Sequence, residues 1–255
     1  MATDSDLRVT LVQRAASLDP ADNLAALDDL EPLLADSDLV VLPEASARDF
    51  GEPGSDLAPY AETFEGAYAT RLRELAQDTV IVAGMFEVAP DPARPYNTLV
   101  ATGPGMDARY RKIHLYDSFG IRESDQLTAG PIDWVSVEAG SANVGLMTCY
   151  DLRFPELARG LGADVIVVPA AWVAGPHKLD HWSTLLRARA IENVAYVVGV
   201  GQPGPRYTGH SMVVSPMGEI LAEAGDGPEV VSITIDLDEV ARARTTNPSL
   251  SNRRL

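Results

Sequence analysis

The sequence predicts an α/β fold of four layers, α-β-β-α, in which two mixed sheets pack face to face and helices cover the outside. Segments typical of strands alternate along the chain with segments whose apolar residues have helical spacing. The expected strands are many and the long helices are only about four, which indicates two packed sheets. With 255 residues, 46% hydrophobic content and no break in composition, we expect one domain over residues 1–255.

The first half of the chain supplies strands, helices and a hairpin in turn. Strands are expected at 7–13, 39–42 and 80–87, helices at 20–34 and 67–77, and a hairpin of strands 96–102 and 108–112. Gly103-Pro104-Gly105 forms the expected turn of this hairpin. Residues 116–131 are expected to form a loop.

The second half repeats the alternation without repeating the sequence. Strands are expected at 143–148, 165–168, 195–200, 211–215, 219–222 and 230–235, and helices at 155–161 and 180–193. Residues 249–255 form a polar C-terminal tail.

Composition argues against several classes of partner. A formal net charge of -17 opposes binding to nucleic acid or to an anionic membrane, because a uniformly acidic surface repels phosphate. The start of the sequence has no basic stretch followed by an apolar one, and no apolar run approaches membrane-spanning length. We therefore expect a cytoplasmic protein that acts on a small molecule.

Two residue types are scarce. Cys149 is the single cysteine, so neither an intrachain disulfide nor a multi-thiolate metal site is possible. Lysine occurs only at Lys112 and Lys178, while arginine supplies every other basic side chain. A compact ammonium fits a tight site that a planar guanidinium would overfill, which draws attention to Lys112 at the end of an expected strand.

Cys149 ends an apolar strand, and Pro155 can begin a helix a few residues later. Such a strand, turn and helix would present the thiol at a sheet edge near backbone N–H groups that can bind an oxyanion. The alternative is a buried structural cysteine. The polar and charged residues that follow Cys149 weaken this alternative.

Two further charged residues stand at the ends of expected strands. Glu44 follows the apolar strand at 39–42 and is a candidate general base for a thiol. Lys112 ends the second strand of the hairpin, and a cation beside Cys149 would favour the thiolate and later an oxyanion. Taken alone, Glu44 would more simply be a solvated loop carboxylate and Lys112 an ordinary surface cation.

The histidines and glycines offer two competing hypotheses. His177 and His181 are four residues apart, but Lys178 replaces the glutamate of a zinc helix and no third ligand is evident, so we expect no metal. Gly199-Val-Gly201-Gln-Pro-Gly204 matches a dinucleotide-binding string. No helix is expected after it, so we interpret it as a turn and disfavour a dinucleotide oxidoreductase.

Three motifs together resemble those of the carbon-nitrogen hydrolase (nitrilase) superfamily. They are Leu42-Pro43-Glu44, Tyr110-Arg111-Lys112-Ile113-His114-Leu115 and Thr148-Cys149-Tyr150-Asp151-Leu152-Arg153-Phe154-Pro155-Glu156, in the family's order and rough spacing. Further matches run from Val168 to Trp172 and on to Gly218. The resemblance implies the same α-β-β-α sandwich, a homodimer formed through helices, and no cofactor.

The resemblance also implies roles for individual residues. Glu44 would be the general base and Cys149 the nucleophile, while Lys112 and the backbone N–H of Tyr150 would hold the oxyanion. Glu123 matches a second family glutamate that positions the lysine or assists proton transfer. The implied reaction converts an amide to an acid and ammonia through a thioester.

The motif around Cys149 is most similar to the ω-amidase and deaminated-glutathione amidase branch. Arg153 and Trp172, together with Tyr150, are the expected substrate-binding residues. Arg153 would either bind a substrate carboxylate or form a structural ion pair with Asp151 or Glu156. The loop at 175–180 is longer than in those amidases and is expected to border the pocket. An N-carbamoyl amino acid hydrolase, and a non-catalytic binding protein on the same fold, remain alternatives.

Overall fold

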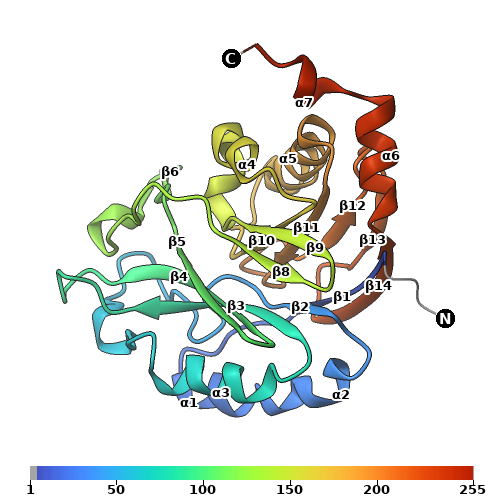
Figure 1. Cartoon of the computed structure of the whole chain (residues 1–255). Helices are drawn as coiled ribbons and strands as arrows, with labels where there is room; N and C mark the ends of the chain where they lie inside the picture. Colours follow the sequence, from blue (N-terminus) through green and yellow to red (C-terminus); the bar gives the residue numbers. More distant parts are fainter. Residues whose placement is uncertain (1–4, 255) are drawn as a thin grey trace.

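Two six-stranded sheets dominate the computed structural model, which describes residues 5–254 (Figure 1). The first has the order β14-β1-β2-β3-β4-β5, formed by Glu229–Asp236, Asp6–Gln13, Leu39–Val41, Val80–Glu87, Tyr96–Gly103 and Met106–Arg111. The second has the order β13-β12-β11-β10-β9-β8, formed by Ile220–Glu223, Met212–Val214, Tyr196–Gly201, Val165–Ala170, Ala142–Leu146 and Ser136–Ala139. Both sheets are mixed, as predicted.

The two sheets share one internal plan. In each, three parallel strands lie together, β1-β2-β3 in one sheet and β9-β10-β11 in the other. Antiparallel strands flank both sets. Every residue of β3 and of β10 is buried, because a sheet in the middle of the sandwich is covered on both faces. This burial explains why these strands consist of almost uninterrupted apolar residues.

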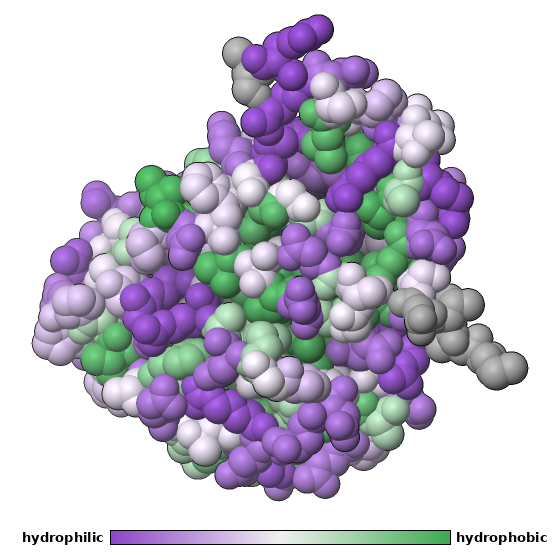
Figure 2. Space-filling model, viewed as in Figure 1, coloured by the Kyte–Doolittle hydropathy of each residue, from purple (hydrophilic) through white to green (hydrophobic). Residues whose placement is uncertain are grey.

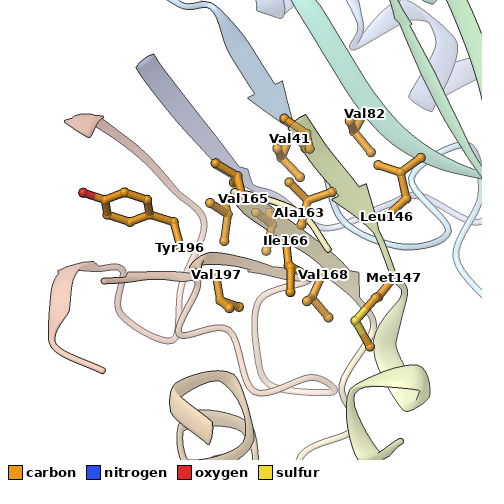
Figure 3. Close-up of a cluster of buried hydrophobic side chains, with 14 of the residues drawn as sticks. Val41, Val82, Leu146, Met147, Ala163, Val165, Ile166, Val168, Tyr196 and Val197 are labelled. Atoms are coloured by element: carbon orange, nitrogen blue, oxygen red, sulfur yellow. The ribbon is translucent and has the colours of Figure 1, made fainter. Parts of the chain in front are cut away.

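One part of the core lies between the sheets, and other parts lie between the sheets and the helices that cover them. Val41 and Val82 of the first sheet belong to the same buried cluster as Leu146, Val165 and Val168 of the second (Figure 3). Burial of each such side chain stabilises the fold by about 1.5–3 kcal/mol relative to an exposed one. The packed interface therefore fixes the position of one sheet relative to the other.

Helices cover both outer faces (Figure 1). On the first sheet lie α1, α2 and α3, formed by Pro20–Ala25, Glu31–Leu34 and Ala67–Leu75. On the second lie α4 and α5, formed by Pro155–Leu161 and Lys178–Asn193. Helices α6 and α7, at Asp238–Thr246 and Ser249–Asn252, follow the last strand. The predicted four-layer sandwich is therefore confirmed.

Short 3-10 helices and a small sheet complete the structure. The 3-10 helices lie at Asp28–Leu30, Ala58–Tyr60, Glu123–Asp125 and Cys149–Arg153. Strands β6 and β7, at Asp117–Ser118 and Ile121–Arg122, pair with each other. Across residues 5–254, every helix falls short of the length and apolar character that crossing a membrane demands.

Four expectations about individual elements were wrong. The helix expected at 20–34 is divided into α1, a 3-10 helix and α2, and Pro32 in α2 has no N–H to donate to the preceding turn of a continuous helix. Strand β8 was missed, although its exposed and buried residues alternate. Helix α6 was missed because it buries only Val240 and Ala243. The expected loop at 116–131 contains β6, β7 and a 3-10 helix.

The C-terminal tail and the glycine string at 199–204 can each be compared with the expected structure. Within the expected polar tail, Ser249–Asn252 is helical, and Leu255 lies outside the described residues. After Gly204 the chain passes through a turn into β12, so no helix follows the glycine string, as predicted.

Hydrophilic residues predominate on the face shown in Figure 2, consistent with the net charge of -17.

Gly84 in β3 fixes the segment that follows β2. Its N–H donates to the Pro43 carbonyl at 3.3 Å, and its carbonyl accepts from the Ala47 N–H at 3.0 Å. A Cβ atom at this position would lie 2.8 Å from Glu44 Cα and closer still to the Ala45 nitrogen. Only glycine allows the two backbones to approach this closely.

We predict that Gly84→Ala lowers the free energy of unfolding by about 1–3 kcal/mol, because the added methyl group meets backbone that cannot rotate away. Urea denaturation followed by circular dichroism measures this change. Gly225→Ala is the matched control, since its added Cβ would meet nothing nearer than 3.8 Å. Equal effects of the two substitutions would contradict the packing described for Gly84.

Candidate active site

The carboxyl ends of central strands from both sheets meet at one edge of the sandwich. Glu44 follows β2 of the first sheet, and Cys149 follows β9 of the second. The Ala171 N–H, directly after β10, donates to Glu44 Oε2 at 2.7 Å. Ligand sites in α/β proteins commonly lie at the carboxyl ends of parallel strands. The fold therefore places two of the three sequence-predicted residues at a favourable position.

Lys112 is a buried ammonium held between two carboxylates. It follows β5 and is 2% exposed. Its Nζ lies 2.9 Å from Glu44 Oε1 and 2.9 Å from Glu123 Oε2. Burial alone would lower the pKa of Lys112, but the negative charges of Glu123 and Glu44 outweigh it and raise the pKa well above 10.5. Lys112 therefore stays protonated.

The Glu44 carboxylate receives donors on both oxygens. Lys112 Nζ and Asn97 Nδ2 donate to Oε1, at 2.9 and 2.7 Å, and the Ala171 N–H donates to Oε2. Gln202 Nε2 donates to the Glu44 carbonyl at 3.0 Å. These bonds fix the side chain and the backbone in one orientation. Asn97, 0% exposed, was not among the sequence-predicted residues.

Glu123 holds Lys112 from the other side. Its carboxylate accepts from the Tyr116 N–H at 2.6 Å as well as from Lys112. Burial raises the pKa of Glu123, while the positive charge of Lys112 opposes this change and the Glu44 carboxylate adds to it. Glu123 therefore holds the ammonium on the side away from Glu44 by charge and by hydrogen bonding.

Cys149 opens the 3-10 helix Cys149–Arg153 with a φ of 49°, in the left-handed region that residues other than glycine rarely adopt. Such strain is concentrated at functional sites. Thr148 anchors the turn, since its hydroxyl donates to the Pro169 carbonyl at 2.9 Å and its N–H to Asp151 Oδ2 at 3.2 Å. The Tyr150 N–H lies in the first turn of this helix, where backbone donors have no partner within the helix.

The Cys149 thiol is protonated in the free protein. Burial raises its pKa well above 9.0, the Glu44 carboxylate raises it further, and Lys112 lowers it by a smaller amount. The expectation that Lys112 would favour the thiolate is therefore outweighed. Proton removal from the sulfur needs a base, and Glu44 interacts with the thiol more strongly than Glu123 does.

Asp151 joins the Cys149 turn to the segment after β5. It is 0% exposed and accepts hydrogen bonds from the Tyr110 hydroxyl at 2.6 Å, the His114 N–H at 3.0 Å and His114 Nδ1 at 2.8 Å. Sequence reasoning missed this role. Both partners stood inside the lysine motif, but nothing in the sequence indicated that they would meet Asp151.

A cavity of about 360 Å³ lies over these residues. Its wall includes every sequence-predicted site residue: Glu44, Lys112, Glu123, Cys149, Tyr150, Arg153 and Trp172. Among residues 5–254, no histidine contributes to the wall, which disfavours a Cys-His pair. Lys178 also lines the cavity, so the segment at 175–180 borders it as expected, although α5 already begins at Lys178.

Arg153 lies against aromatic rings. Its guanidinium carbon is 4.9 Å from the centroid of the Trp172 ring, and Nη2 lies 3.3 Å from His181 Nδ1. Asp151 is occupied by Tyr110 and His114, and among the described residues 5–254 neither Asp151 nor Glu156 forms an ion pair with Arg153. The structural ion-pair alternative is therefore not supported.

Comparison with known proteins identifies the family. Residues 8–245 match the family model described as carbon-nitrogen hydrolase. The chain belongs to this family. The carbon-nitrogen hydrolase fold also appears in a superfamily member from Xanthomonas campestris, solved with an arsenic adduct in its active site. That structure is 30% identical, has a TM-score of 0.89 and covers 98% of each chain.

Two curated relatives have more specific names. A deaminated glutathione amidase of Escherichia coli is 42% identical over 86% of this chain and 86% of its own length. A 2-oxoglutaramate amidase of Paenarthrobacter nicotinovorans is 35% identical over 91% of this chain and 84% of its own length. This carbon-nitrogen hydrolase is thus similar, over most of its length, to enzymes named for amide substrates.

We predict that the Cys149 thiolate forms only above pH 9. The folded-state pKa is raised, so the protonated thiol persists through neutral pH. The ultraviolet absorbance of the thiolate, taken as the difference between the wild type and Cys149→Ser, measures the titration. In Glu44→Gln the midpoint should fall, because a neighbouring negative charge is removed. A wild-type midpoint near neutral pH would contradict the protonated state described here.

Proposed function

We propose that this carbon-nitrogen hydrolase is a cysteine-dependent amidase that converts a small, carboxylate-bearing amide to an acid and ammonia. One observation carries the proposal: Glu44, Lys112 and Cys149, which lie far apart in the sequence, share the wall of one cavity. A base, a cation and a nucleophile in that arrangement suit attack on a carbonyl carbon.

In the first half of the reaction, Glu44 takes the proton from Cys149 as the sulfur attacks the amide carbonyl carbon. The carbonyl π electrons move to oxygen, and the Lys112 ammonium and the Tyr150 N–H stabilise the resulting oxyanion. When the tetrahedral intermediate collapses, the carbon–nitrogen bond breaks. Glu44 returns the proton to nitrogen, ammonia leaves, and a thioester to Cys149 remains.

In the second half, Glu44 removes a proton from water, which attacks the thioester carbon. A second oxyanion forms at the same place and collapses with cleavage of the carbon–sulfur bond. The proton passes back to the sulfur, and the carboxylic acid is released. Glu123 acts through Lys112, whose ammonium lies 2.9 Å from the Glu123 carboxylate.

The carboxylate on the substrate is supported by Arg153, a cavity-lining guanidinium without a carboxylate partner among residues 5–254. Arginine binds carboxylates through paired hydrogen bonds, and Trp172 and Tyr150 supply apolar surface beside it. The relatives named for deaminated glutathione and 2-oxoglutaramate support the same class of substrate.

We predict that the protein releases ammonia from 2-oxoglutaramate, from deaminated glutathione, or from both, and that Cys149→Ala lowers the rate by about 10³-fold or more. A coupled ammonia assay, with circular dichroism to show that the variant is folded, measures this loss. Activity that survives in Cys149→Ala would defeat the proposal. Release of carbon dioxide with ammonia from an N-carbamoyl amino acid, and no turnover of the two amides, would identify an N-carbamoyl amino acid hydrolase instead. No turnover of any of these compounds would favour a binding protein.

A further inference from the structure

Lys178 is a second buried ammonium that the proposed reaction does not use. It is the first residue of α5, is 7% exposed, and lines the same cavity as Cys149. Its Nζ donates to the Tyr116 hydroxyl at 2.7 Å and lies 3.8 Å from the centroid of the Phe119 ring. Both neighbours are uncharged at neutral pH, so neither supplies a counter-charge.

Lys178 and Arg153 differ from the other cations of the cavity wall because they lack a carboxylate partner in the described part of the chain. Within residues 5–254, each of the other cations has a carboxylate partner: Lys112 pairs with Glu44 and Glu123, Arg122 with Asp125, and Arg206 with Asp49. Lys178 and Arg153 form no such pair, although acidic residues outnumber basic ones 37 to 20 in the sequence. The wall of this cavity therefore contains two cations without carboxylate partners among the described residues, although the protein as a whole is acidic.

These two cations also act on each other. Burial lowers the pKa of Lys178, and the positive charge of Arg153 lowers it further. The Nε atom of Arg153 is buried without a hydrogen-bond partner. Two like charges and an unused donor in a low-dielectric wall are unfavourable until an anion arrives. A bound carboxylate would supply both the counter-charge and the missing acceptor.

We propose that Lys178 and Arg153 together bind the carboxylate of the substrate, and that Lys178 determines the preference for carboxylate-bearing amides over uncharged ones. This inference rests on the proposed amidase function and adds to it a specificity-determining residue. The remaining acid of the cavity wall, Glu52, is exposed in the segment 51–55, and within residues 5–254 it forms no ion pair with either cation.

The indole of Trp172 connects the two cations. Its Nε1 donates to the Lys178 carbonyl at 2.9 Å, which fixes the first residue of α5, and its ring supports the Arg153 guanidinium. The site is therefore assembled before the ligand binds, and the carboxylate has little side-chain entropy to overcome. Because Trp172 holds the backbone of residue 178, a substitution there can remove the side-chain charge while the backbone keeps its position.

The test uses succinamate and butyramide, which differ by a carboxylate in place of a methyl group. Calorimetry with the Cys149→Ala protein measures binding without turnover. Adding Lys178→Met should weaken succinamate binding at least about tenfold, because a charge-assisted contact is lost. Lys178→Arg should restore part of the affinity. In active enzyme, Lys178→Met should lower the succinamate to butyramide ratio of kcat/KM by a similar factor.

Arg122→Met is the matched control, because it removes a cavity-lining charge that already has a partner in Asp125. It should change succinamate binding far less than Lys178→Met does. Equal weakening by the two variants, equal weakening for butyramide, or no binding of succinamate to the parent protein would each overturn the inference. Binding needs no turnover, so these results are distinguishable from failure of the ammonia assay.

Discussion

Lys112 is an ammonium at 2% exposure, and taking such an ion out of water costs several kcal/mol unless partners compensate. The compensation comes from Glu44 and Glu123, whose oxygens lie 2.9 Å from its Nζ. Glu44 also accepts from the Ala171 N–H, directly after β10 of the other sheet. The ion cluster is therefore linked to both sheets, and Gly84 allows the Glu44 backbone to lie close to β3.

The same cluster explains the state of the thiol. Because Glu44 and burial raise the pKa of Cys149, the free enzyme holds an unreactive protonated sulfur beside a carboxylate. In the proposed reaction, the proton moves from Cys149 to Glu44 as the sulfur attacks the substrate carbonyl carbon. Arg153 and Lys178 also line this cavity but lack acid partners among the described residues. The reacting cation Lys112 is thus paired with carboxylates, whereas the two cations proposed to bind substrate are not.

Sequence patterns predicted what depends on order along the chain. Their places at strand ends marked Glu44, Lys112 and Cys149 as candidates, and the resemblance of the three motifs to one family assigned them to a site. The alternation of elements predicted the sandwich. Partners that meet only in space were missed: Asn97 is 53 residues from Glu44, and Ala171 is 127 residues from it. Helix α6 was missed for a different reason, since it is polar and buries little.

In the proposed reaction, one sulfur carries the acyl group between amide and acid. Rapid acid quenching of the enzyme during turnover of 2-oxoglutaramate, followed by mass spectrometry of its peptides, tests this claim directly. We expect an adduct on the peptide that contains Cys149, with the mass of the substrate minus ammonia. Steady turnover with an unmodified Cys149 peptide at every quench time would contradict it.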